Sequence, residues 1–279
     1  MKSETLLCLV LVLSGGWPDF CQTAHADEIG TSTEPRYLAQ TDPWAVEALT
    51  KIRRKDGQAH PGLPELAQFR TNRSDRFLVD IQYVSAGHPF KGRRALQPHQ
   101  GAHIHWDNST NAWPKGGGAV SNYPAIYAVA DGYVDRIDYS FKVGANDRYG
   151  VSIAFAKDKG TVYSFCAGIE PMIPEPAPNF YRRFILVSQG QQVKKGDILA
   201  YMYLPPGARG GSHIHFHIQA HNGGAFLAPA IFTDEIVAGF RAHWNGFGRD
   251  GATLMPACMG YLLDADENPF GTAAIDVLK

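Results

Sequence analysis

The chain has 279 residues, with 26 lysine and arginine residues against 27 aspartate and glutamate residues, and its formal net charge is −1. This balance excludes the strong positive field that binds nucleic acids and anionic membrane surfaces, so neither is expected as a partner. Glycine accounts for 29 of the 279 residues, which exceeds the usual share of about 7% and favours a turn-rich β protein.

The first 26 residues have the pattern of a cleavable signal peptide. Lys2 precedes an apolar stretch over residues 6–13, and residues 24–26 fit the small-x-small pattern of a signal-peptidase site. The apolar stretch is too short to span a membrane, and no later stretch is long enough. We therefore expect a mature protein that begins near Asp27, carries no membrane anchor and is exported to a periplasm or to the exterior.

Residues 27–75 form a polar extension that is interrupted by prolines, with one helix expected from Trp44 to about Arg54. From Phe77 onwards the pattern changes to short apolar runs rich in β-branched and aromatic residues, separated by turns. The expected strands are Phe77–Val84, His103–Trp106, Ala125–Ala130, Tyr133–Tyr139, Val151–Phe155, Thr161–Phe165, Phe184–Val187, Ile198–Tyr203 and His213–Ile218. Asp131-Gly132 is a hairpin-type turn between two of them.

These strands predict an all-β domain over residues 76–232, with a compact antiparallel sheet or sandwich as its core. Residues 233–279 are expected to form a C-terminal helix from Asp234 to about Trp244, followed by an irregular tail. Removal of the signal peptide leaves Cys166 and Cys258, which either form one disulfide or remain two separately buried thiols.

The segment Ser212–Ile218 alternates strictly between polar and apolar residues, and every polar position after Ser212 is a histidine. Alternation of this kind is typical of a β-strand, so His213, His215 and His217 are expected to project from one face. One interpretation is a half-buried strand whose histidines bond to water or backbone. The other is a metal or catalytic site, which needs imidazoles that converge.

A second histidine cluster supports the metal interpretation. His103, His105 and Asp107 follow the same alternation, and His99 lies four residues before His103. Zinc binds imidazole nitrogen and carboxylate oxygen, and three protein ligands plus one water are typical of a catalytic zinc site. Two short strands with histidine-bearing faces predict such a site.

The order of motifs from His99 to Ile218 resembles the lysostaphin-type (LytM-like) zinc endopeptidases, which cut peptide bonds in bacterial peptidoglycan. The matching segments, in chain order, are His99-x-Gly101-x-His103, Pro124–Val134, Tyr149-Gly150, Val193–Leu199 and His213-x-His215-Phe216. The resemblance implies an all-β fold of the LytM type, a bound Zn²⁺ ion and peptidoglycan peptide as the partner.

The resemblance also implies roles for the second histidine motif. His215 corresponds to a zinc ligand of the family, and His213 corresponds to the residue that handles a proton on the attacking water.

The family's first motif is His-x-Gly-x-Asp, and it matches this chain in two registers. One register keeps Gly101 and takes His99 and His103 as ligands, with histidine in place of the family's aspartate. The other keeps the His-x-x-x-Asp spacing and takes His103 and Asp107. The glycine register is slightly preferred, because an apolar residue, Ile104, follows His103 as one follows the family's aspartate.

The chain departs from the family pattern in two places. Family members carry another active-site histidine shortly after a strand tyrosine, but Tyr163–Ile169 contains none. Losing one donor to a developing oxyanion typically costs about 10²–10³ in rate, and Tyr163, His217 and His221 are conceivable substitutes. His217 also stands where the family usually has an acidic or amide residue, as an outer partner of a ligand or as a spare ligand.

Two functions follow from the resemblance. The first is an exported zinc endopeptidase that acts on peptidoglycan cross-links through metal-activated water, which the retained His213 favours. The alternative is a catalytically weak or inactive module that binds cell-wall peptide or regulates another hydrolase, which the missing histidine favours.

Overall fold

The computed structural model describes residues 62–88, 90, 101–143, 146–173, 179–221, 226–243 and 268–271. The expected signal peptide, the expected helix from Trp44 to Arg54, His99 and Cys258 lie outside these ranges, as does most of both terminal extensions. Those expectations stay predictions.

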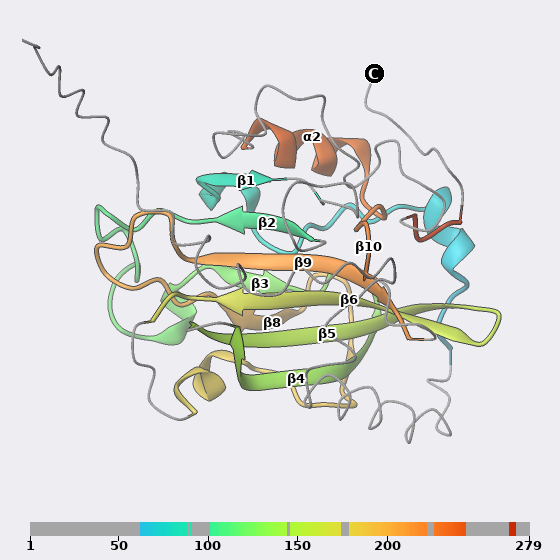
Figure 1. Ribbon diagram of the computed structural model, residues 1–279, viewed down its shortest axis with the longest axis horizontal. Coiled ribbons are helices and arrows are strands. Elements are labelled where there is room, and N and C mark those ends of the chain that lie inside the picture. The colour runs from blue at the N-terminus through green and yellow to red at the C-terminus, as the bar shows by residue number, and fades with distance from the viewer. Residues whose placement is uncertain are drawn as a thin grey trace, which may run out of the picture. The chain divides into compact units, whose positions relative to one another are not determined.

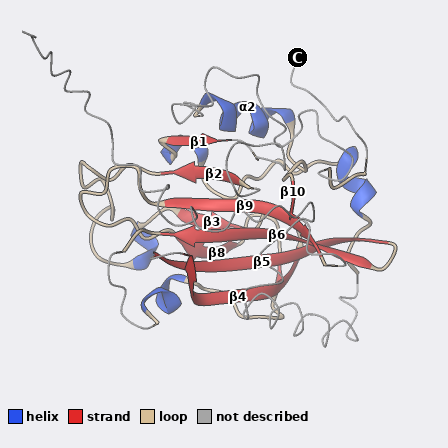
Figure 2. Cartoon of the chain, in the orientation of Figure 1, coloured by secondary structure: helices blue, strands red, loops and turns tan. Residues whose placement is uncertain are grey.

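One antiparallel sheet dominates the described residues (Figures 1 and 2). Its strands follow the order β1-β2-β9-β6-β5-β4-β7, and β10 pairs with β9. The strands are β1 (Ala86–His88), β2 (Ala102–His105), β4 (Gly132–Val143), β5 (Asn146–Asp158), β6 (Thr161–Glu170), β7 (Gln192–Val193), β9 (His213–Ala220) and β10 (Phe226–Leu227). The predicted all-β fold class is confirmed.

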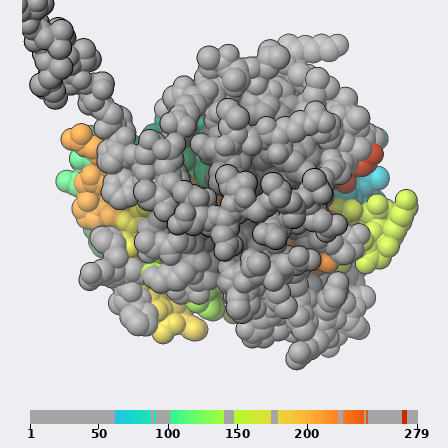
Figure 3. Space-filling view, viewed as in Figure 1, coloured from blue at the N-terminus to red at the C-terminus, as the bar shows by residue number. Residues whose placement is uncertain are grey.

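The sheet combines strands that are close in sequence with strands that are distant. β4, β5 and β6 are consecutive antiparallel neighbours, and the segment that joins β5 and β6 protrudes from the sheet (Figures 1 and 3). β2 and β9 pair although more than 100 residues separate them along the chain. This pairing brings the two histidine clusters to neighbouring strands.

The apolar positions of the histidine strands face a core that also includes the second sheet. β3 (Ala125–Tyr127) and β8 (Ile198–Tyr201) pair with each other and form that two-stranded sheet. Ile104 and Phe216 are fully buried, and the Phe216 ring lies 6.0 Å from the ring of Phe240. Phe240 belongs to helix α2 (Asp234–Ala242), which confirms the helix expected after the core. None of the described helices has the length and apolarity needed to cross a membrane.

Two of the expected strands are wrong. Phe77–Val84 contains only a 3₁₀ turn at Ile81–Tyr83, although residues 77–79 are buried and the Leu78 carbonyl accepts a hydrogen bond from the backbone of Tyr127. Phe184–Val187 follows a 3₁₀ turn and makes a single bridge, from Ile185 to Ala200. In both cases the short apolar run indicates that the segment is buried, not that it is a strand, because an irregular segment that covers a core is as apolar as a strand.

The expected hairpin at Asp131-Gly132 is also wrong. β3, before the turn, pairs with β8, while β4, after the turn, pairs with β5 and β7, so the turn carries the chain from one sheet to the other. The Asp131 carboxylate accepts hydrogen bonds from the backbone and side chain of the 194–195 turn. A Cβ atom on Gly132 would lie 2.2 Å from the carbonyl oxygen of Ala154, so glycine is required by this close strand contact.

Candidate metal centre

The register between β2 and β9 brings the two histidine clusters together. His103 pairs with His215, and His105 pairs with His213. Directly opposed residues of antiparallel strands project from the same face. The four imidazoles therefore share one face of the sheet, as the alternation in both stretches predicts.

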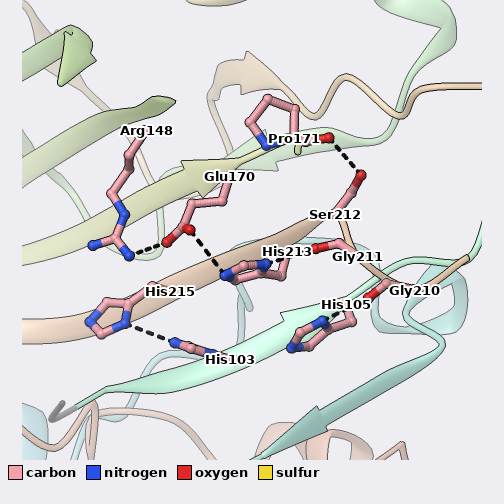
Figure 4. A network of polar contacts seen from close by, with 10 residues as sticks. All are labelled: His103, His105, Arg148, Glu170, Pro171, Gly210, Gly211, Ser212, His213 and His215. Carbon is pink, nitrogen blue, oxygen red and sulfur yellow. Dashed lines mark hydrogen bonds and ion pairs between the residues drawn. The ribbon is translucent and has the colours of Figure 1, made fainter. Parts of the chain in front are cut away.

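His103 and His215 are in direct contact through their rings (Figure 4). Nε2 of His103 and Nδ1 of His215 lie 2.9 Å apart, and the two side chains are buried. Two imidazole nitrogens that bind one tetrahedral zinc ion lie about 3.3 Å apart, given zinc–nitrogen bonds of about 2.0–2.1 Å. The pair therefore fits two neighbouring positions of a zinc site after a small outward movement of the rings.

Gly101 lies directly against the ring of His215. A Cβ atom at this position would be 2.1 Å from Cε1 and 2.3 Å from Nε2 of His215. No side chain fits such a gap, so the glycine is needed for the imidazole to reach His103. This close contact explains why the His99-x-Gly101-x-His103 motif has a glycine at position 101.

His213 is held from both sides of its ring. Its Nδ1–H donates to the carbonyl of Gly211 over 2.9 Å, and its Nε2 lies 3.4 Å from Oε2 of Glu170. The ring also stacks on His105 at 4.8 Å between centroids, and Nδ1 of His105 bonds to the carbonyl of Gly210 (Figure 4). His213 therefore has a fixed orientation beside the His103–His215 pair.

Glu170 and its partner Arg148 were not among the site residues predicted from the sequence. Glu170 ends β6, pairs with His213 across the strands and forms an ion pair with Arg148 (Figure 4). Burial alone would raise the pKa of Glu170, but the charges and hydrogen bonds of His213 and Arg148 outweigh it and lower the pKa to about 2. The sequence did offer a signal for Glu170, because this acidic residue directly follows the apolar residues 165–169 and precedes Pro171.

We expect replacement of Glu170 by glutamine to make the free energy of unfolding depend less on pH in the acidic range. The folded pKa lies below the ordinary value of 4.5, so the stabilisation is present above pH 4.5 and is lost as the pH falls toward 2. A shift of this size corresponds to about 3 kcal/mol. Urea unfolding at a series of pH values measures the effect, with Glu65→Gln as the control, since Glu65 forms an exposed ion pair with Lys157. Identical acid limbs for wild type and Glu170→Gln would contradict the expectation.

His217 contacts the other side of His215. Its Nδ1 lies 3.1 Å from Nε2 of His215, and its ring stacks on Phe226 at 3.8 Å. Burial, followed by the positive charges of Arg136 and Arg148, lowers the pKa of His217 to about 3. His217 is therefore a neutral imidazole that contacts the candidate ligand His215.

Asp107 follows β2 and lies apart from the paired histidines. Its exposed carboxylate accepts a hydrogen bond from the backbone N–H of Ser109 over 2.7 Å, and hydrogen bonding to Ser109 lowers the pKa of Asp107. Within the described part of the chain, no three His, Cys, Asp or Glu side chains gather as a metal site. His103 does lie beside His215 and His213, whereas Asp107 does not join them, and His99 lies outside the described residues.

The segment that lacks the family's histidine lies in β6. Phe165 packs in the core, and the buried thiol of Cys166 is free, with its pKa raised to about 12 by burial. His221 contacts a different group of residues, because its Nε2 lies 3.2 Å from Asp135 and 2.7 Å from the hydroxyl of Ser164. Its imidazole is thus engaged with Asp135 and Ser164.

Comparisons with known proteins give solved structures only. No protein-family model and no curated protein matches the chain. A zinc-containing peptidase from Vibrio cholerae is 18% identical over 55% of this chain and 39% of that chain, with a TM-score of 0.30. The catalytic domain of a mutant of the prophage-encoded M23 protein EnpA from Enterococcus faecalis is 18% identical over 56% and 94%, with a TM-score of 0.33. Lysostaphin is 13% identical over 67% and 60%, with a TM-score of 0.34.

This chain spans less than two thirds of the Vibrio peptidase and of lysostaphin. The three structures are thus a zinc-containing peptidase, an M23 protein and lysostaphin.

Proposed function

We propose that the chain is an exported zinc-dependent endopeptidase that cuts peptide cross-links of peptidoglycan. The observation that carries the proposal is the buried contact between His103 and His215, with the fixed ring of His213 beside it. A peptidase of this class needs imidazole ligands and a neighbouring group that exchanges protons. The first and the last of the matching motifs supply these groups, on the paired strands β2 and β9.

Two described residues, His103 and His215, fit a zinc ion, and the glycine register of the first motif adds His99 as the third ligand. When bound, zinc would polarise a peptide carbonyl and would lower the pKa of its bound water to about 7. His213 is proposed to take and return a proton at Nε2, because its Nδ1 is committed to Gly211. Glu170 faces that same nitrogen and holds the ring in position.

The alternative function is a module that binds cell-wall peptide, or regulates another hydrolase, without cutting. The observation that favours it is the segment of β6 where the family has its additional histidine, since Phe165 there packs in the core. Such a protein keeps a peptide groove and a metal but lacks one donor to the transition state.

Metal content and cleavage separate the two functions. Protein purified without a histidine tag is analysed for bound metal and incubated with muropeptides, and the products are resolved by mass spectrometry. One zinc ion per chain with cleavage of cross-links supports the endopeptidase. Bound zinc without cleavage supports the binding module, and a wild-type protein that binds no metal contradicts both zinc proposals.

The two registers of the first motif predict different ligands. We expect His99→Ala to weaken zinc binding by more than roughly 100-fold, since even the loss of an outer partner costs 10–100-fold. Asp107→Asn should leave the affinity unchanged, because the Asp107 carboxylate is exposed and bonded to Ser109. Zinc competition with a chromophoric chelator measures both variants, and a large loss in Asp107→Asn alone would select the other register.

A further inference from the structure

We propose that His217 positions His215 for metal binding, by accepting a hydrogen bond from Nε2–H of His215 so that Nδ1 keeps its lone pair toward His103. This inference rests on the proposed zinc site and adds a residue outside its ligand set. The sequence motif left His217 open as an outer partner or as a spare ligand, and the geometry points to the first.

Both ring nitrogens of His215 have neighbours, and the two neighbours differ. Nδ1 lies 2.9 Å from Nε2 of His103, in the candidate metal centre. Nε2 lies 3.1 Å from Nδ1 of His217, on the opposite side of the ring. We assign Nδ1 as the ligand nitrogen, because it faces His103, which is a ligand in both registers of the first motif.

Proton placement follows from this assignment. A neutral imidazole carries one N–H, so a lone pair on Nδ1 of His215 requires the proton on Nε2. That N–H needs an acceptor, and Nδ1 of His217 supplies one when His217 carries its own proton on Nε2. If His217 were instead the donor, the proton of His215 would sit on Nδ1 and block the ligand position.

The surroundings of His217 keep its acceptor in place. The side chain is buried, and its ring lies parallel to that of Phe226, 22° apart in plane and 3.8 Å between centroids. Pairing of β10 with β9 fixes Phe226 opposite Gln219, and pairing of β6 with β9 fixes Cys166 opposite His217. Such enclosure limits the access of water, so no solvent molecule readily replaces the acceptor if His217 is removed.

Ligating histidines generally donate their second N–H to a fixed partner, and loss of that partner typically costs 10–100-fold in metal affinity. A carboxylate or a carbonyl is the usual partner, whereas this chain uses a third imidazole. A neutral acceptor of this kind sets the tautomer without adding negative charge to the centre.

Three substitutions at one position test the proposal, with zinc affinity measured by chelator competition on the full chain. Oδ1 of asparagine lies close to the position of Nδ1 of histidine, whereas the amide of glutamine reaches toward the position of Nε2. We expect His217→Ala and His217→Gln to bind zinc 10–100-fold more weakly than wild type. His217→Asn should stay within about threefold, because it restores the acceptor.

Far-UV circular dichroism and thermal unfolding of the metal-free variants establish that each is folded. A second measurement needs no variant: long-range ¹H–¹⁵N NMR of zinc-loaded wild type is expected to show the proton of His215 on Nε2. Two results would overturn the role of His217 and leave the zinc site standing. One is that wild type and all three variants bind zinc equally well. The other is that the proton of His215 lies on Nδ1. Wild type that binds no zinc overturns the site and the inference together.

Discussion

The His215→Ala variant is expected to lose zinc and all zinc-dependent cleavage. His215 is the central imidazole of the cluster, since one nitrogen contacts His103 and the other contacts His217. Alanine removes a proposed zinc ligand together with both of these contacts. We expect affinity to fall by more than roughly 100-fold, because the loss of an outer partner alone costs 10–100-fold.

The measurements for this variant are metal content after dialysis and product formation from muropeptides. His243→Ala is a matched control, because His243 lies in the segment after α2 and its Nδ1 bonds to the carbonyl of Gly239, away from the histidine strands. The control should keep its zinc. Full zinc occupancy in His215→Ala would remove this residue from the ligand set.

Gly101→Ala is expected to disable the centre without touching any histidine. The new methyl group would lie within 2.1–2.7 Å of three ring atoms of His215, closer than non-bonded atoms approach. Because the ring is packed between Gly101, His103 and His217, it must leave its position. Overpacking in a buried site typically costs 1–3 kcal/mol of stability, and the displaced imidazole should weaken zinc binding by at least about tenfold.

Denaturant unfolding and chelator competition measure the two effects. Gly118→Ala is the control, since a Cβ atom there has no neighbour within 4 Å and the backbone is not left-handed. If Gly101→Ala matches wild type in both stability and zinc affinity, the ring of His215 does not need a glycine beside it. The contact of Gly101 with His215 would then no longer support the glycine register.

Much of the fold could be predicted from periodicity. The two-residue alternation at 213–218 and at 103–106 predicted which side chains face the core and which share the polar face, and β9 and β2 follow that assignment. Alternation is a local property with a steric cause, so one sequence is enough to show it. Residues 184–187 form a continuous apolar run and residues 79–83 alternate, yet neither segment forms a strand. Apolar residues there indicate burial without strand pairing.

The site was predictable in part for the same reason. His103 and His215 stand in motifs whose order implied a shared centre, and the register places them opposite each other. Glu170 reaches His213, and Arg148 reaches Glu170, only through pairing across β5, β6 and β9, which no local pattern encodes, so both residues were missed. The contact of Gly101 with His215 likewise depends on a neighbouring strand far away in the sequence.

Distance along the chain separates the parts of the candidate centre, and this has a consequence for how the molecule forms. His103 and His215 are 112 positions apart, whereas β4, β5 and β6 follow one another as local hairpins. Closing a long loop costs more entropy than closing a short one, so the hairpins are expected to form first. Until β9 docks against β2, the two histidines lie on separate parts of the folding chain. Binding of the proposed zinc ion is therefore expected to be a late step, after the central hairpins have formed.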